Sequence, residues 1–147
     1  MLRLNGGESF ASGCSRFHDH AANSYEPTSK IFVKVDFSSI ETQLLAQLDT
    51  GSPFSMLERE VAESLGLLDG DGQQVSVDTR LGLCRGRLER ASLTLVADVG
   101  DSLEVEAVFF VSTEWRGKTF LGYTGLLDHI RMALDPGTNL FYFGLLE

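Results

Sequence analysis

Short runs in which apolar and polar residues alternate are the feature that most restricts the fold of this chain. Apolar residues recur at every second position in residues 31–37 and 103–111, and nearly so in residues 42–48. Alternation with a period of two is typical of a strand with one buried face. Gly, Ser, Asp and Pro gather between the runs, as expected for turns. About seven or eight short strands against two short helices predict a mainly β domain.

Two segments have helical character. Leu57, Val61 and Leu65 lie four residues apart, and Gly66 follows directly. This spacing places the three apolar side chains on one face of a short helix that a glycine ends. Residues 125–130 predict a further turn or two of helix.

Two hairpins are expected in the second half of the chain. Residues 75–79 and 87–96 flank a glycine-containing turn at residues 82–86, which predicts a long and mostly polar hairpin. Near the C-terminus, residues 132–145 contain the turn sequence Asp-Pro-Gly-Thr at residues 135–138. That sequence favours a second hairpin.

The length allows one ordinary hydrophobic core. A chain of 147 residues with 43% hydrophobic content is expected to form a single domain. Residues 1–28 are rich in Ser, Gly, Asn and His without a sustained period, which predicts an irregular N-terminal lead-in. Residues 29–147 are then the folded domain.

Charge and composition limit the partners. Twelve Lys and Arg residues against twenty-one Asp and Glu residues give a net charge of −9, which repels nucleic acid and anionic membranes. No window approaches the roughly 18 apolar residues of a membrane-spanning helix. Met1 to Phe10 lacks the apolar run of a signal peptide, and Cys14 and Cys84 are the only cysteines. We therefore expect a soluble, cytoplasmic protein without disulfides, nucleic acid or membrane partners.

The tetrad Asp49-Thr50-Gly51-Ser52 is the most informative motif. It follows the predicted strand 44–48, at the point where the chain must turn into Pro53 and Phe54. In isolation such a sequence is a common turn, because Asp bonds the backbone that follows it and Gly accepts a positive φ. A second element, Phe120-Leu121-Gly122 followed by a short helical segment, adds to the signal.

Together these elements resemble retropepsin, the single-domain aspartic protease of retroviruses and its bacterial relatives. The order in that family is an Asp-Thr-Gly loop, a glycine-bearing flap hairpin, and an apolar-apolar-Gly segment that leads into a helix. The same order occurs here over about residues 30–145. The resemblance implies an acid-protease fold, a closed or partly open β-barrel with one or two short helices.

The resemblance also implies a homodimeric aspartic endopeptidase that acts on peptides or proteins without a cofactor. Two Asp49 carboxylates, one from each chain, would share a proton and activate water between them. A single tetrad per chain requires a two-fold axis beside Asp49. By resemblance, Thr50 would bond across the axis, Gly51 would allow close backbone approach, and Ser52 would donate to the Asp49 carboxylate.

The same resemblance implies roles for further residues. Leu121 and Gly122 would pack under the Asp49 tetrad and support it. Pro53, Phe54 and Tyr123 replace the residues that form an inter-loop ion pair in retroviral enzymes, so the C-terminal hairpin becomes a candidate interface. The flap that covers the substrate would comprise Thr79, Arg80, Leu81, Gly82 and Leu83.

Several of these residues allow a second interpretation. A dimer of the same fold could be catalytically silent and serve as a binding or assembly module. The tetrad also has the residue types of a phosphate-cradling loop, although no further phosphate loops are found. His18-Asp19-His20 with Cys14 has metal-binding residue types without a second ligand pair, and Trp115 could either cap the core or line a cleft.

Overall fold

The computed structural model describes residues 1–25 and 28–146. Of these residues 48% lie in strands and 6% in helices, so the expected mainly β class is confirmed. Among them, one α-helix and one 3₁₀ helix interrupt the strands, α1 (Arg59–Ser64) and η1 (Leu127–His129). The strands are β1 (Gly13–Arg16), β2 (His18–His20), β3 (Lys30–Asp36), β4 (Leu44–Leu48), β5 (Ser55–Met56), β6 (Gln73–Thr79), β7 (Gly82–Leu95), β8 (Val99–Gly100), β9 (Leu103–Val111), β10 (Phe120–Leu121), β11 (Ile130–Asp135) and β12 (Leu140–Leu145).

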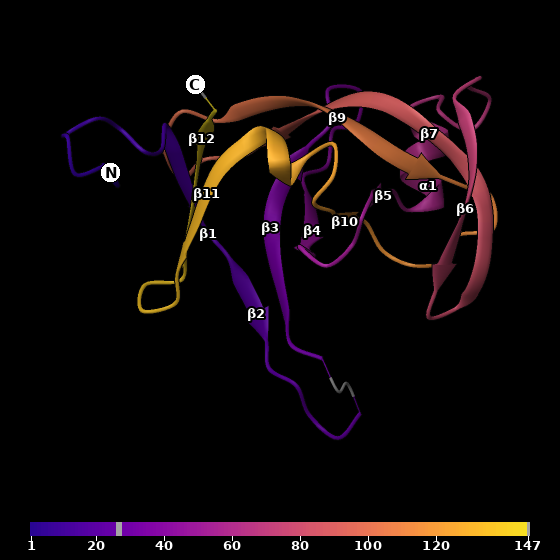
Figure 1. Cartoon of the computed structure of the whole chain (residues 1–147), viewed down its shortest axis with the longest axis horizontal. Coiled ribbons are helices and arrows are strands. Elements are labelled where there is room, and N and C mark those ends of the chain that lie inside the picture. Colours follow the sequence, from indigo (N-terminus) through magenta and orange to yellow (C-terminus); the bar gives the residue numbers. More distant parts are fainter. Residues whose placement is uncertain (26–27, 147) are drawn as a thin grey trace.

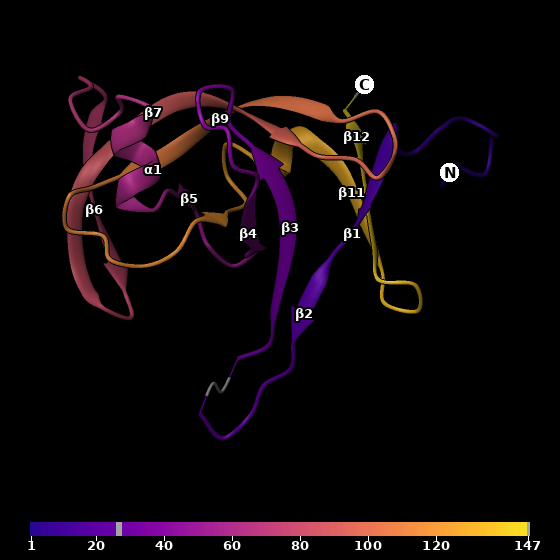
Figure 2. The same ribbon diagram turned by 180° about the vertical axis from the view of Figure 1, so that it is seen from behind.

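The described strands form two sheets. The larger sheet has the order β2-β3-β4-β10-β5-β9-β7-β6, and β3 also pairs with β7. The smaller sheet has the order β11-β12-β1-β8. Figures 1 and 2 show the smaller sheet at one end of the molecule and the β6–β7 hairpin at the other. The expectation that the larger sheet forms a closed or partly open barrel stays a prediction.

Strand β9 separates two apolar clusters. Phe109 belongs to the main core, whereas its neighbour Phe110 belongs to a smaller cluster with Met56, Cys84 and Trp115. Both phenylalanines are fully buried because successive side chains of a strand point to opposite faces and both faces are covered here. The smaller cluster lies beneath the candidate site described below.

Several predicted elements are present. The strands expected at residues 31–37 and 42–48 correspond to β3 and β4, which pair as an antiparallel hairpin. The apolar face of α1 is buried through Val61 and Ala62, and Gly66 follows the helix with a φ of +72°. That conformation favours glycine and explains why the helix ends there. No helix among the described residues is long and apolar enough to cross a membrane.

The expected irregular lead-in is wrong for residues 13–20. Strand β1 lies between β12 and β8, and Cys14 and Phe17 are buried. These strands are too short to show a period in the sequence, and they exist because distant strands supply their hydrogen bonds. The division between a lead-in at 1–28 and a domain at 29–147 stays a prediction.

The turn predicted at residues 82–86 is also displaced. The chain reverses at Arg80 and Leu81, and residues 82–86 already belong to β7. Thr79 closes the turn, because its hydroxyl donates to the Gly82 carbonyl oxygen at 2.7 Å and accepts from the Leu81 N–H at 3.1 Å. Gly86 is not a turn residue; it allows β7 and β9 to pack closely, because a Cβ there would lie 2.3 Å from the carbonyl oxygen of Val111.

Candidate active site

The Asp49 loop, residues 49–54, joins β4 to β5 and is held by its own backbone. The Gly51 N–H donates to Oδ1 of Asp49 at 3.1 Å, and the Ser52 N–H donates to the Asp49 carbonyl oxygen at 3.1 Å. Asp and Gly in this order favour such a turn. The two bonds hold the Asp49 carboxylate against the backbone that follows it, and Asp49 is half-buried.

Strand β10 supports this loop from below. It runs parallel to β4, and the Asp49 N–H donates to the Leu121 carbonyl oxygen at 2.9 Å. The Gly122 N–H donates to Oγ of Ser55 at 2.9 Å. Both Leu121 and Gly122 are buried, so the structure places the predicted supporting pair against the loop.

The role expected for the Ser52 hydroxyl differs from the structure. Ser52 Oγ donates to the Phe54 carbonyl oxygen at 2.7 Å rather than to the Asp49 carboxylate. The reason is local, because a Ser hydroxyl readily bonds backbone groups of neighbouring residues in the chain. The Ser52 backbone is fixed as well, since its carbonyl oxygen accepts from the Tyr123 N–H at 2.9 Å.

A cleft of about 790 Å³ lies between the Asp49 loop and the β6–β7 hairpin. Asp49, Gly51 and Ser52 line it from the loop, while Thr50 is exposed outside the lining. From the predicted flap, the hairpin contributes Thr79, Arg80 and Leu81 to the lining but not Gly82 or Leu83. The strand register explains the difference, because Gly82 and Leu83 lie beyond the turn on β7.

An apolar wall lines the cleft beside Asp49. Trp115 and Phe120 pack edge to face with ring centroids 5.5 Å apart, and the Trp115 Nε1–H donates to the Lys118 carbonyl oxygen at 3.2 Å. Trp115 is only 6% exposed yet lines the cleft, so it both caps buried side chains and forms part of the cleft wall. The remaining apolar side chains of this wall are Phe54, Met56 and Val77.

Most of this wall was missed in the sequence. Met56 and Phe120 lie on strands of two residues, which show no readable period. Val75 and Val77 alternate on β6 and indicated a strand, but not which face meets the cleft. The pairing of β10 with β5 brings Phe120 beside Met56, and the pairing of β10 with β4 places both next to the Asp49 loop.

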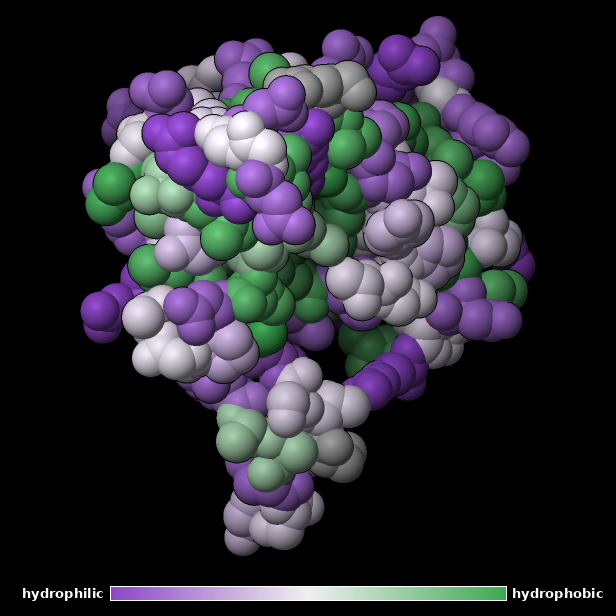
Figure 3. Space-filling model, turned by 60° about the vertical axis from the view of Figure 1, so that its left-hand side comes forward, coloured by the Kyte–Doolittle hydropathy of each residue, from purple (hydrophilic) through white to green (hydrophobic). Residues whose placement is uncertain are grey.

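Residues 21–25 and 28–29, between β2 and β3, project from the body in Figures 1 and 2, and in Figure 3 this part carries mostly hydrophilic and neutral residues. Thr28 lines the cleft from this projection, and Lys30 lines it from the start of β3. His18, Asp19 and His20 are exposed on β2, and no group of three or more metal-ligand side chains occurs in residues 1–25 and 28–146.

Comparison with known proteins finds similarity at the level of structure. No protein-family model matches the chain, and no curated protein matches it. Among solved structures, a retropepsin-like aspartic protease from Rickettsia conorii is similar over 85% of this chain and 96% of that chain. The sequences are 16% identical and the TM-score is 0.49. Similarity of this degree decides neither the family nor the activity.

Proposed function

We propose that this chain is one half of a homodimeric aspartic endopeptidase with a retropepsin-like fold. The observation that carries the proposal is the position of the Asp49 carboxylate, which lines a large cleft opposite the tip of the β6–β7 hairpin. The Gly51 N–H donates to this carboxylate, and the Asp49 N–H donates to the Leu121 carbonyl oxygen. A carboxylate held at the wall of a peptide-sized cleft is suited to acid–base chemistry on a bound substrate.

The shape of the loop suits a two-fold axis. Thr50 and Gly51 are exposed at its tip, and among the described residues no segment covers them. One chain contributes a single Asp-Thr-Gly tetrad, so a second carboxylate of the same kind must come from another copy. An isologous contact through Thr50 would place the two Asp49 side chains on either side of the axis.

Such a pair would hydrolyse a peptide bond without a metal or cofactor. Two carboxylates in contact hold one proton between them, because ionising both would place like charges together. The ionised carboxylate takes a proton from water as the water oxygen attacks the carbonyl carbon. The protonated carboxylate gives its proton to the carbonyl oxygen. Collapse of the tetrahedral intermediate then breaks the C–N bond: the carboxyl that took the proton from water gives it to the leaving nitrogen, and the other carboxylate takes a proton from a hydroxyl of the intermediate, which restores the pair.

The cleft would hold an extended peptide beneath the hairpin. Thr79, Arg80 and Leu81 are placed to cover it, and closure would exclude water from the reacting groups. The apolar wall of Trp115 and Phe120 would accept apolar side chains of the substrate. Each part of this arrangement uses residues that line one continuous cleft.

The test is hydrolysis of an unfolded protein at about pH 4 to 6, where a coupled carboxylate pair can hold one proton. Asp49→Asn should lower the rate by about 1,000-fold, in the range that one acid–base group supplies. Asp69→Asn is the matched control, because Asp69 is an exposed loop carboxylate outside the cleft lining and should leave the rate unchanged. Full activity of the Asp49→Asn variant would contradict the proposal.

A second candidate function has one observation in its favour. Ser52 gives its hydroxyl hydrogen to Phe54, so the Asp49 carboxylate lacks a donor that the resemblance implied. A dimer with this fold could then serve as a silent binding or assembly module. Dimerisation without cleavage of any unfolded protein across that pH range would favour the silent module over the peptidase.

A further inference from the structure

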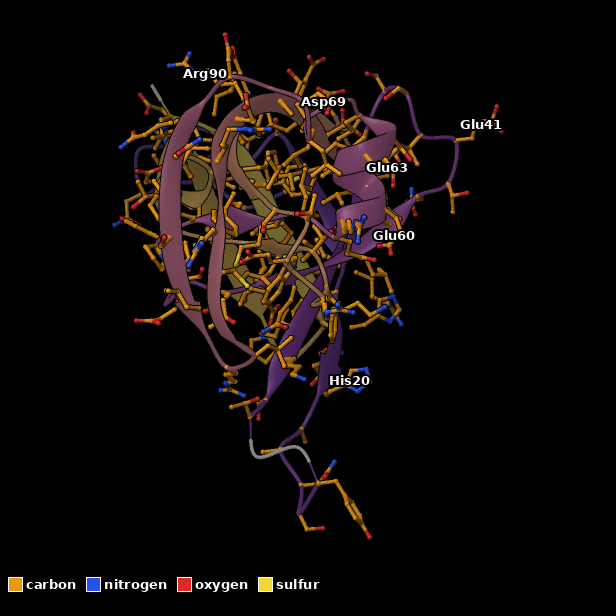
Figure 4. All side chains as sticks on the ribbon, turned by 90° about the vertical axis from the view of Figure 1, so that its right-hand side faces the viewer. His20, Glu41, Glu60, Glu63, Asp69 and Arg90 are labelled. Carbon is orange, nitrogen blue, oxygen red and sulfur yellow. The ribbon has the colours of Figure 1, made fainter. Side chains whose placement is uncertain are left out.

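A second cavity of about 580 Å³ adjoins the cleft at Ser76, where β6, β7 and β9 run side by side. Its charged lining residues are Arg85 and Arg87, so no carboxylate lines it. Figure 4 shows this side of the molecule, with the β6–β7 hairpin on the left and α1 on the right. We call this space the arginine cavity. Two cationic lining residues stand out in a chain with a net charge of −9.

The strand register explains why these side chains meet. Arg85 and Arg87 are two positions apart on β7 and therefore point to the same face of the sheet. Their partners on β6 are Ser76 and Gln74, which are exposed on that face. On the other side, Arg87 is paired with Val111 of β9. The floor of the cavity is thus a cross-strand patch of hydrogen-bonding side chains.

The two guanidinium groups differ in how they are held. Arg87 is fixed, because one terminal nitrogen donates to the Leu68 carbonyl oxygen and Nε lies 3.6 Å from the Glu89 carboxylate. That Nε is buried without a hydrogen-bond partner. In the part of the chain that the structure describes, the Arg85 guanidinium makes no hydrogen bond or ion pair. Donor capacity therefore remains at both arginines.

The carboxylates beside the two arginines are already engaged. Glu89 accepts from the Gly72 N–H at 2.8 Å, and Glu114 accepts from the Arg85 backbone N–H at 2.8 Å. Other acidic groups on this side, labelled in Figure 4, are exposed and do not line the cavity: Glu60, Glu63 and Asp69. None of these five carboxylates lines the arginine cavity.

We propose that the arginine cavity is a binding site for a small oxyanion that carries carboxylate or phosphate groups. The planar guanidinium fork matches both groups bidentately, and a partly enclosed site strengthens such charge-assisted bonds. Arg85 would be the adjustable contact and Arg87 the fixed one, with Ser76 and Gln74 as side donors. The cavity adjoins the proposed peptidase cleft, because Ser76 lines both, but no residue of the Asp49 loop lines it and anion binding there does not depend on peptidase activity.

The experiment is isothermal titration of the full chain with inorganic phosphate and, separately, with citrate, at constant ionic strength. Arg85→Gln should weaken binding by about tenfold or more, which corresponds to about 1.4 kcal/mol. Arg85→Lys should weaken it less, because the charge remains while the fork is lost. Arg90→Gln is the matched control, since Arg90 lies on the same strand, is exposed, and points to the opposite face.

The outcomes separate clearly. Saturable binding of either anion that is lost in the Arg85→Gln variant and retained in the Arg90→Gln variant would support the site. Tighter binding of phosphate or of citrate would show whether the natural ligand carries phosphate or carboxylate groups. Absence of saturable binding, or equal weakening in both variants, would overturn it. Thermal unfolding of each variant shows that the comparison is made between folded proteins. Arg87 is left unchanged because its bond to Leu68 contributes to the fold.

Discussion

A Cβ atom on Gly122 would lie 2.2 Å from the carbonyl oxygen of Phe54, so β10 and the Asp49 loop are in backbone contact at this point. Real Cβ atoms do not approach a carbonyl oxygen that closely. The position of the loop, and with it the position of Asp49, therefore depends on the absence of a side chain at residue 122.

Gly122→Ala is expected to destabilise the protein by about 1–3 kcal/mol, the range for an added methyl in a packed site. Urea unfolding measures the change. Gly6→Ala is the control, because nothing lies within 4 Å of a Cβ there, and it should change the free energy of unfolding by less than about 0.5 kcal/mol. Equal stability of the two variants would mean that the loop and β10 are not in close contact.

Thr50→Arg is expected to convert a dimer into a monomer, because it places two like charges at the proposed axis. Sedimentation velocity measures the state, and hydrolysis of unfolded protein should fall with the loss of dimer. Thr42→Arg adds the same charge at an exposed position before β4 and should leave the dimer intact. A Thr50→Arg protein that remains dimeric would place the interface elsewhere.

Asp98 gives the protein a pH-dependent contribution to stability. The Lys34 ammonium and the Arg16 N–H, which donates at 2.7 Å, lower the pKa of the Asp98 carboxyl below its ordinary value. A lowered pKa in the folded state contributes stability above the unfolded value, about 3.9, and loses it as the pH falls through the folded value. Asp98→Asn should therefore destabilise the protein at pH 7.

The size of that effect should be modest, about 0.2–1 kcal/mol, because the Asp98 side chain is 41% exposed and solvent screens the pair. The difference in unfolding free energy between the two proteins should shrink as the pH drops from about 4 towards 2. Asp101→Asn, in the same region of the chain, serves as the control for losing one carboxylate. A difference that is constant across pH would exclude the ion pair as its source.

Trp115 is the single tryptophan of the chain and lies in the wall of the cleft, so its fluorescence should report on peptide binding. We expect the emission of the inactive Asp49→Asn protein to shift on titration with an apolar peptide. Phosphate should leave it unchanged, because Trp115 is not in the lining of the arginine cavity. A peptide that binds by calorimetry without any change in emission would show that it binds outside the cleft.

Local patterns in the sequence were enough to predict the elements that depend on interactions between neighbouring residues. The alternation in residues 31–37 and 103–111 and the spacing of Leu57, Val61 and Leu65 predicted β3, β9 and α1. The tetrad at Asp49 predicted a turn after a strand, and the structure has that turn. These successes share a cause, because periodicity and turn chemistry act within a few residues.

The sequence by itself therefore determined the mainly β class, the Asp49 turn and the glycine at residue 122. Only the tertiary structure decided that β1 and β2 exist and that the hairpin turns at Arg80 and Leu81. It also decided which side chains line the cleft and that Arg85 and Arg87 share a cavity. The physical reason is that strand pairing supplies hydrogen bonds and neighbours from distant segments, which no local pattern of residues specifies.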